Sequence, residues 1–138
     1  MVAHINNRKH WFTFLQVQKY LVEKNFDWIK LNICSKSKAI KGRGKIDIKG
    51  KKYELLISYS PFSNYRYDRI FINDRSIQYE PNNHLYWDNS LCLYHPLIDK
   101  PYFQIMPLYR MIPWISEWII WYEQWKIYGV WLGKEIKH

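Results

Sequence analysis

The sequence predicts an α+β domain in which two helices flank an antiparallel sheet. Apolar residues recur at helical spacing from Asn7 to Lys24, and a second helical stretch begins at Pro113. Between them, from Trp28 to Asn73, four stretches alternate apolar and polar residues as half-buried strands do. Because the strands follow one another instead of alternating with helices, we expect a meander. With 138 residues, the chain fits one domain spanning residues 1–138.

The two helices have recognisable ends. Asn25 is placed to end the first helix. Proline is common at a first helical position, so Pro113 is expected to open the second helix, and Gly129 to end it in a left-handed conformation. This leaves residues 130–138 as a short tail. Four indoles of the second helix fall on one stripe, which indicates core packing: Trp114, Trp118, Trp121 and Trp125.

A basic segment, residues 36–52, contains a predicted strand. Ile46 and Ile48 alternate with charged residues, and Gly50 then turns the chain. The segment holds a single acid, Asp47, against eight basic residues: Lys36, Lys38, Lys41, Arg43, Lys45, Lys49, Lys51 and Lys52. The pattern indicates a strand with one solvated, charged face, and an anion-binding patch is the alternative.

The net charge of +9 and an aromatic content of 19% indicate an anionic partner, either a nucleic acid or an acidic protein. Charge alone does not choose between them. The amino terminus lacks the apolar run of a signal peptide, so we expect a cytoplasmic protein with reduced thiols. No membrane partner is expected, because Glu117 and Glu123 interrupt the most apolar segment. The chain has no phosphate-binding glycine motif, so no cofactor is expected.

The loop from Pro81 to Pro96, PNNHLYWDNSLCLYHP, is the candidate site. It combines turn-forming residues with a potential nucleophile, Cys92, and ordered loops often carry chemistry. Cys92, His84 and His95 could supply three zinc ligands, but Cys34 would be needed as a fourth and no paired CxxC spacing exists, so no metal is expected. The signature of a papain-like hydrolase is also absent. Cys34 is expected to be a structural or surface thiol.

Tyr86 and residues 88–93 reproduce the spacing of the catalytic-cysteine segment of ubiquitin-conjugating enzymes, which reads HPN, any residue, Tyr, any residue, Asp-Gly, any residue, Ile-Cys-Leu. Where that pattern has His-Pro-Asn, this chain has Asn-Asn-His, so His84 stands in the place of the asparagine. Together with the tryptophan-rich end from Pro113, PWISEWIIWYEQWKIYGVWLGKEIKH, the chain resembles the bacterial conjugating-enzyme homologues of CBASS antiphage operons. It resembles the stand-alone type, known as type II short.

The resemblance implies a ubiquitin-conjugating-enzyme-like fold with Cys92 and His84 as catalytic residues. Cys92 would form a thioester with the C-terminal tail of a cGAS-like nucleotidyltransferase and pass it to a lysine amine, which regulates cyclic-oligonucleotide signalling. His84 would donate to the oxyanion or act as a base; the plainer alternative is that it holds the loop through backbone hydrogen bonds. His95 is a second candidate base. Asp88 and Asn89 would form the turn, with Asn89 left-handed, and Asp88 could also orient the amine.

This mechanism needs the Cys92 thiol to be reachable at the mouth of a groove that fits an extended chain end. The sequence leaves open whether a separate activating enzyme takes part. Two alternatives also stay open: a scaffold that binds the nucleotidyltransferase without catalysis, and a nucleic-acid-binding module that uses the basic segment and nearby aromatic residues. The sequence favours a protein partner over nucleic acid.

Overall fold

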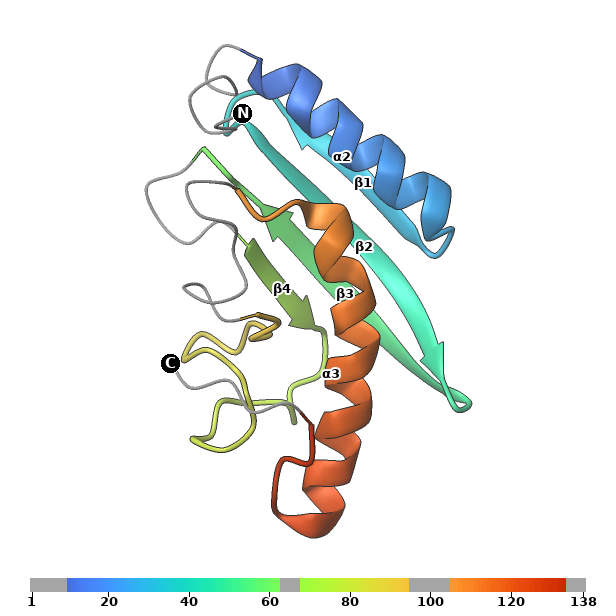
Figure 1. The fold of residues 1–138 in the computed structure, drawn as a ribbon, viewed down its shortest axis with the longest axis vertical. Coiled ribbons are helices and arrows are strands. Elements are labelled where there is room, and N and C mark those ends of the chain that lie inside the picture. Colours follow the sequence, from blue (N-terminus) through green and yellow to red (C-terminus); the bar gives the residue numbers. More distant parts are fainter. Residues whose placement is uncertain (1–9, 63–67, 95–104, 134–138) are drawn as a thin grey trace.

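The computed structural model describes residues 10–62, 68–94 and 105–133. Its elements follow the predicted order of helix, four strands and helix, which confirms the α+β class (Figure 1). They are α2 (Trp11–Asn25), β1 (Ile29–Cys34), β2 (Ala39–Ile48), β3 (Lys51–Tyr59), β4 (Asp68–Ile72) and α3 (Leu108–Tyr128). The strands pair in the order β1-β2-β3-β4, each antiparallel to the next, so the predicted meander is also confirmed.

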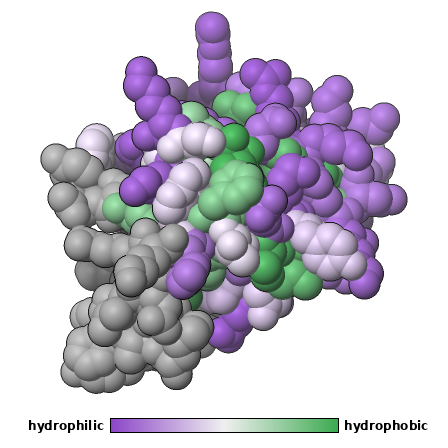
Figure 2. Space-filling model, turned by 90° about the horizontal axis from the view of Figure 1, so that it is seen from above, coloured by the Kyte–Doolittle hydropathy of each residue, from purple (hydrophilic) through white to green (hydrophobic). Residues whose placement is uncertain are grey.

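Both helices cover the same face of the sheet (Figure 1). The core lies between the helices and this face of the sheet, and its fully buried side chains include Leu15, Ile40, Leu55, Ile70 and Ile115. No helix among the described residues covers the other face, and its lysines and arginines are exposed. Hydrophilic side chains also surround the apolar ones when the described surface is seen from the end where α2 begins (Figure 2).

The start of α3 corrects the prediction. The helix begins at Leu108, and Pro113 lies inside it. Two contacts explain the earlier start: buried Leu108 anchors the first turn, and the side-chain oxygen of Gln18 on α2 accepts a hydrogen bond from the Tyr109 N–H at 3.3 Å. Such an oxygen satisfies one of the N–H groups that a helix leaves free at its start. The predicted ends hold, since α2 ends at Asn25 and Gly129, with φ of 74°, caps α3.

Of the predicted short tail, the structure describes residues 130–133. Trp131 is half-buried and packs against the core. A Cβ on Gly133 would lie 2.6 Å from the Trp121 ring, so the backbone at Gly133 rests on that indole. Three indoles of the tryptophan stripe pack as predicted, with Trp118 in the core and Trp114 and Trp125 packed against it, whereas Trp121 is half-buried outside this cluster.

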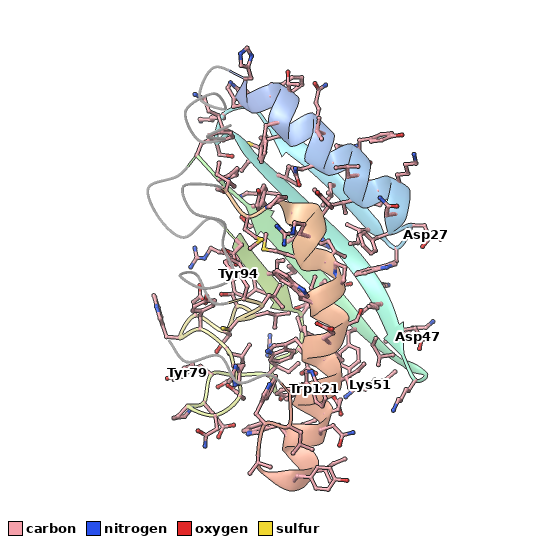
Figure 3. The ribbon with its side chains drawn as sticks, in the orientation of Figure 1. Asp27, Asp47, Lys51, Tyr79, Tyr94 and Trp121 are labelled. Carbon is pink, nitrogen blue, oxygen red and sulfur yellow. The ribbon has the colours of Figure 1, made fainter. Side chains whose placement is uncertain are left out.

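Glu123 connects α3 to β3. Its Oε1 accepts hydrogen bonds from the Tyr53 hydroxyl at 2.6 Å and from the Lys51 Nζ at 3.3 Å, and pairs with Lys126 at 3.1 Å. Lys51 lies beside the half of α3 that carries Trp121 (Figure 3). Burial acts to raise the pKa of Glu123, but the hydrogen bonds from Tyr53 and Lys126 and the Lys126 charge outweigh it, so the net pKa is lowered.

The free energy of unfolding should therefore fall in acid. A carboxyl with a lowered folded pKa stabilises the protein above its unfolded pKa, near 4.5, and this stabilisation is lost as the pH falls through the folded value. Glu123→Gln should be less stable than wild type at neutral pH, and the difference should shrink as the pH falls below the unfolded value. Urea unfolding of both proteins, from neutral pH to below the unfolded pKa, measures this difference in the free energy of unfolding. Glu117→Gln, an exposed change on the same helix, is the control, and a difference that is constant with pH would contradict the argument.

Candidate functional site

The loop around Cys92 folds into a tight hairpin. Leu85 pairs with Leu91 in an isolated antiparallel bridge, and the N–H of Tyr86 donates to the Ser90 carbonyl at 2.9 Å. Asn89 has a φ of 72°, which confirms the predicted left-handed conformation. Its side-chain oxygen accepts a hydrogen bond from the Tyr79 N–H at 2.7 Å, so the same residue both makes the turn and fastens the chain that leads into it.

Asp88 braces the hairpin against the sheet. One carboxylate oxygen accepts hydrogen bonds from the Ser90 N–H at 3.0 Å and the Ser90 hydroxyl at 2.6 Å. The other oxygen accepts from Nε and Nη2 of Arg69 on β4 at 3.1 and 2.8 Å. This confirms that Asp88 forms the turn. To orient an incoming amine, Asp88 would have to give up one of these bonds, so that role stays a prediction.

The hairpin places Cys92 opposite His84. The Cys92 N–H donates to the His84 carbonyl at 3.1 Å, and the preceding N–H, of Leu91, donates to the Ile70 carbonyl of β4 at 2.8 Å. The Cys92 side chain is only 4% exposed. The prediction of a reachable thiol is therefore wrong for the protein in this structure. Its neighbours Leu91 and Leu93 are buried as well, so the segment that carries the cysteine lies against the body of the domain.

His84 has two sets of contacts. Its carbonyl also accepts a hydrogen bond from the Trp118 Nε1–H at 2.9 Å, so one backbone oxygen joins the cysteine strand to α3. Its ring stacks on Trp131, with centroids 4.6 Å apart. The backbone of His84, at a left-handed φ of 54°, thus does what the plainer alternative requires. Its role as a base or oxyanion donor stays a prediction.

Sequence reasoning missed two groups that support this hairpin. Trp131 lies against both His84 and Trp118, the latter at 5.8 Å between ring centroids. Asp68, only 2% exposed, accepts a hydrogen bond from the Tyr94 hydroxyl at 3.0 Å, and Tyr94 lies beside β4 (Figure 3). A tryptophan two residues after the glycine that ends a helix is a signal that could have indicated the first group. Nothing local indicates the second.

Trp131→Ala should loosen the hairpin. Stacked aromatic pairs contribute about 0.5–1.5 kcal/mol beyond the area they bury, so we expect a loss of about 1–2 kcal/mol in the free energy of unfolding. The His84 ring protons, which lose the shielding of the indole, should also shift in NMR spectra. Leu132→Ala, at a neighbouring position that is 51% exposed, should change neither quantity. An unchanged His84 signal in Trp131→Ala would contradict the stacking.

The remaining candidates lie elsewhere. His95 is outside the described residues. Cys34 is half-buried at the end of β1, and hydrogen bonds from Ser37 lower its pKa. Its role as a structural or surface thiol stays a prediction. Within residues 10–62, 68–94 and 105–133, no cluster of three potential metal ligands exists. Neither α2 nor α3 combines the length and hydrophobicity needed to cross a bilayer.

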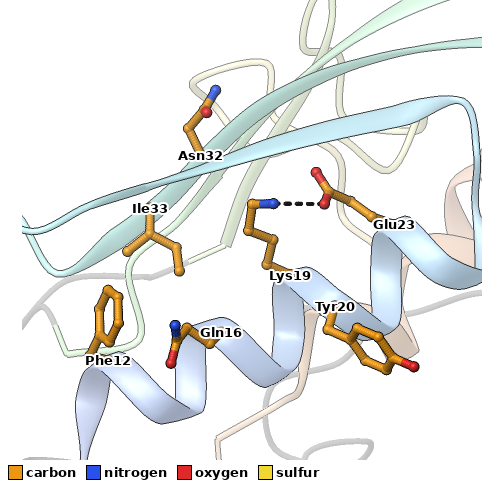
Figure 4. Close-up of a pocket in the computed structure, with 7 residues that line it drawn as sticks. All are labelled: Phe12, Gln16, Lys19, Tyr20, Glu23, Asn32 and Ile33. Carbon is orange, nitrogen blue, oxygen red and sulfur yellow. Dashed lines mark hydrogen bonds and ion pairs between the residues drawn. The ribbon is translucent and has the colours of Figure 1, made fainter.

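A pocket of about 490 Å³ lies between α2 and β1 (Figure 4). Glu23, which lines it, pairs with Lys19 at 2.7 Å and accepts a hydrogen bond from the Leu31 N–H of β1 at 2.8 Å. The lining residues are Phe12, Gln16, Lys19, Tyr20, Glu23, Asn32 and Ile33. Since β1 and β4 form opposite edges of the sheet, this pocket is not the predicted groove beside Cys92.

A leading helix, a four-stranded meander, a cysteine-bearing hairpin at the last strand and a closing helix define a protein of the ubiquitin-conjugating (E2-like) class. The family model described as "Type II CBASS E2 protein" matches residues 18–138, so the chain belongs to this family of antiphage-operon proteins. The family confirms the resemblance drawn from the loop and the tryptophan-rich end. No curated protein and no solved structure matches the chain.

Proposed function

We propose that this E2 protein is an acyl carrier that acts in the cytoplasm through a thioester at Cys92. The donor is the C-terminal carboxyl of a cGAS-like nucleotidyltransferase, and the acceptor is a lysine amine. Family membership supports a conjugating-enzyme type of activity. The observation that carries the assignment to Cys92 is the hairpin, in which the left-handed Asn89 and the braced Asp88 hold the cysteine strand opposite His84.

The chemistry is two acyl transfers. A separate activating enzyme supplies the carboxyl as a thioester, because the chain itself has no phosphate-binding glycine motif. The Cys92 thiolate attacks the carbonyl carbon and the activating enzyme's thiolate leaves. A lysine amine then attacks the new thioester, an isopeptide bond forms, the Cys92 thiolate leaves and the amine loses a proton. His84 acts as the oxyanion donor or as the base that takes this proton.

Transfer requires the thiol to be uncovered. A sulfur in a side chain that is 4% exposed cannot reach a carbonyl carbon on another protein. The free protein should therefore react slowly with iodoacetamide at Cys92, and more quickly once the nucleotidyltransferase is bound.

A thioester assay tests the proposal. The protein, the nucleotidyltransferase, the activating enzyme and ATP are mixed and run on non-reducing gels. Wild type and the matched control Cys34→Ala should give an adduct that thiols remove. Cys92→Ala should give none, and Cys92→Ser should give an ester that resists thiols. An adduct that persists in Cys92→Ala would overturn the proposal.

The buried thiol favours a second candidate, a scaffold that binds the nucleotidyltransferase without chemistry. The two differ in what the sulfur does. Phage resistance that is unchanged by Cys92→Ala, with binding intact, would establish the scaffold, whereas loss of resistance with intact binding would establish the carrier.

A further inference from the structure

The side chains on the sheet face opposite α2 and α3 form rows. Strand register places residues side by side across all four strands, and the side chains that alternate with the buried ones point away from the helices. One row consists of Lys30, Arg43, Leu56 and Phe71, and the next of Asn32, Lys41, Ser58 and Arg69. Lys45 follows on β2, opposite Glu54. We call this surface the outer basic face.

Four cations of this face, Lys30, Lys41, Arg43 and Lys45, are exposed and form no ion pair within the part of the chain that the structure describes. Lys30 is attracted electrostatically to the Glu23 carboxylate, which already forms an ion pair with Lys19. The three on β2 follow one another at about 6.6–6.8 Å, since alternate residues share a face. Lys30 lies directly opposite Arg43, and like charges in that position are destabilising. The arrangement favours an anionic partner.

The rest of the face favours a protein over a nucleic acid. Leu56 and Phe71 continue the Lys30 row and are half-exposed, which gives the surface an apolar spot beside its charges. Glu54 lies among the cations and would repel a phosphate chain. Phe71 is the one aromatic side chain in the two rows, whereas single-strand binding relies on several stacking rings. A carboxylate-rich protein surface with an apolar residue over Leu56 and Phe71 satisfies all three features.

The outer basic face leads to the cysteine hairpin. Arg69, at the end of the Lys41 row, binds Asp88 at 2.8 Å, and the next residue, Ile70, accepts the Leu91 hydrogen bond. β2 and β4 are two strand spacings apart, about 9–10 Å. A partner seated on β1 and β2 would therefore need only a few extended residues to bring a chain end to the hairpin.

We propose that the outer basic face docks a carboxylate-rich surface on the body of the acyl donor, the nucleotidyltransferase, and so holds its tail near Cys92. This rests on the proposed function for the identity of the donor. The docking itself does not require the Cys92 sulfur, so the two proposals can fail separately.

The test uses a nucleotidyltransferase without its C-terminal tail, so that only body contacts remain. Its Kd is measured by biolayer interferometry at about 50 mM and about 300 mM salt. Lys41→Gln/Arg43→Gln should weaken binding about tenfold at low salt and less at high salt. Lys24→Gln/Lys36→Gln removes the same charge from exposed positions outside the two rows and should change Kd less than about twofold. Melting temperatures confirm that each variant folds, and Lys30→Gln/Lys45→Gln repeats the test at independent positions.

Equal Kd values for the face variant and the control variant, or no binding to wild type, would overturn the docking proposal. It would also be overturned if oligothymidylate bound more tightly than the truncated donor and lost that affinity in Lys41→Gln/Arg43→Gln. Full-length donor separates the two proposals. If the face variant forms the adduct at the wild-type rate under subsaturating conditions, the docking proposal is wrong and the thioester proposal is retained. If binding depends on the face but no adduct forms, the docking proposal is supported and the thioester proposal is wrong.

Discussion

Trp118→Ala is expected to lower the free energy of unfolding by about 3–5 kcal/mol, the range for removing a large aromatic side chain from a core. Trp118 is 3% exposed, and its indole N–H donates to the His84 carbonyl, as the Cys92 N–H also does. Removing the ring also takes away a partner of Trp131, so the Cys92 thiol should react faster with iodoacetamide. Urea denaturation measures the first effect, and alkylation followed by mass spectrometry measures the second.

The hairpin supplies a matched control, Trp87→Ala, because Trp87 is 81% exposed. We expect its free energy of unfolding to stay within about 0.5 kcal/mol of wild type, as for most surface changes. Trp118→Phe keeps a ring but loses the donor, and should cost about 1–3 kcal/mol. If Cys92 reacted at the wild-type rate in both Trp118 variants, this indole would have no part in covering the thiol.

Gly42→Ala should have the second large effect. A Cβ at this position would lie 2.3 Å from the Lys30 carbonyl oxygen and 2.5 Å from Leu31 Cδ2. The oxygen belongs to the paired strand and cannot swing aside, so β1 and β2 must separate. Overpacking of this kind costs about 1–3 kcal/mol and more against backbone, so we expect the upper end, about 3 kcal/mol. Thermal and urea unfolding measure the loss.

Gly44→Ala is the graded comparison on the same strand. Its Cβ would lie 3.0 Å from the Trp28 ring and carbonyl, a contact that a small shift relieves. The expected cost is about 1 kcal/mol. Equal losses for the two variants would mean that close backbone approach is not what requires Gly42.

The sequence predicted the fold well because the strand signals are local. Apolar and polar residues alternate on β1 and β3, as in Ile29, Leu31 and Tyr53, and the meander pairs each strand only with its neighbours in sequence. On β2 the alternation is clear only at Ile46 and Ile48, because glycines occupy positions 42 and 44. The start of α3 could not be predicted in the same way. Leu108 already continues the helical spacing, but Pro113 is the stronger local signal, and the group that supports the earlier start, Gln18, is remote in sequence.

In the candidate site, too, local features were predicted from the sequence and long-range contacts were not. The left-handed turn at Asn89 follows from residue type and was predicted correctly. The contacts that hold the hairpin to α3 and the chain after it involve Trp118 and Trp131, which meet His84 only after the chain has folded. From the sequence, the apolar residues Leu91 and Leu93 were recognised only as part of the family motif. In the structure both are buried, and the segment that carries Cys92 is buried with them. A motif gives the identity of a nucleophile without its accessibility.

The hydrogen bond from Trp118 to the His84 carbonyl has a consequence for biosynthesis. Its two partners are 34 residues apart, and a ribosome adding about 5–20 residues per second needs a few seconds to make the second after the first. Until Trp118 is added, the hairpin lacks this tie to α3. The contact is therefore among the last to form as the protein is made, and a chain that ends before Trp118 should hold the Cys92 segment less firmly than the full chain.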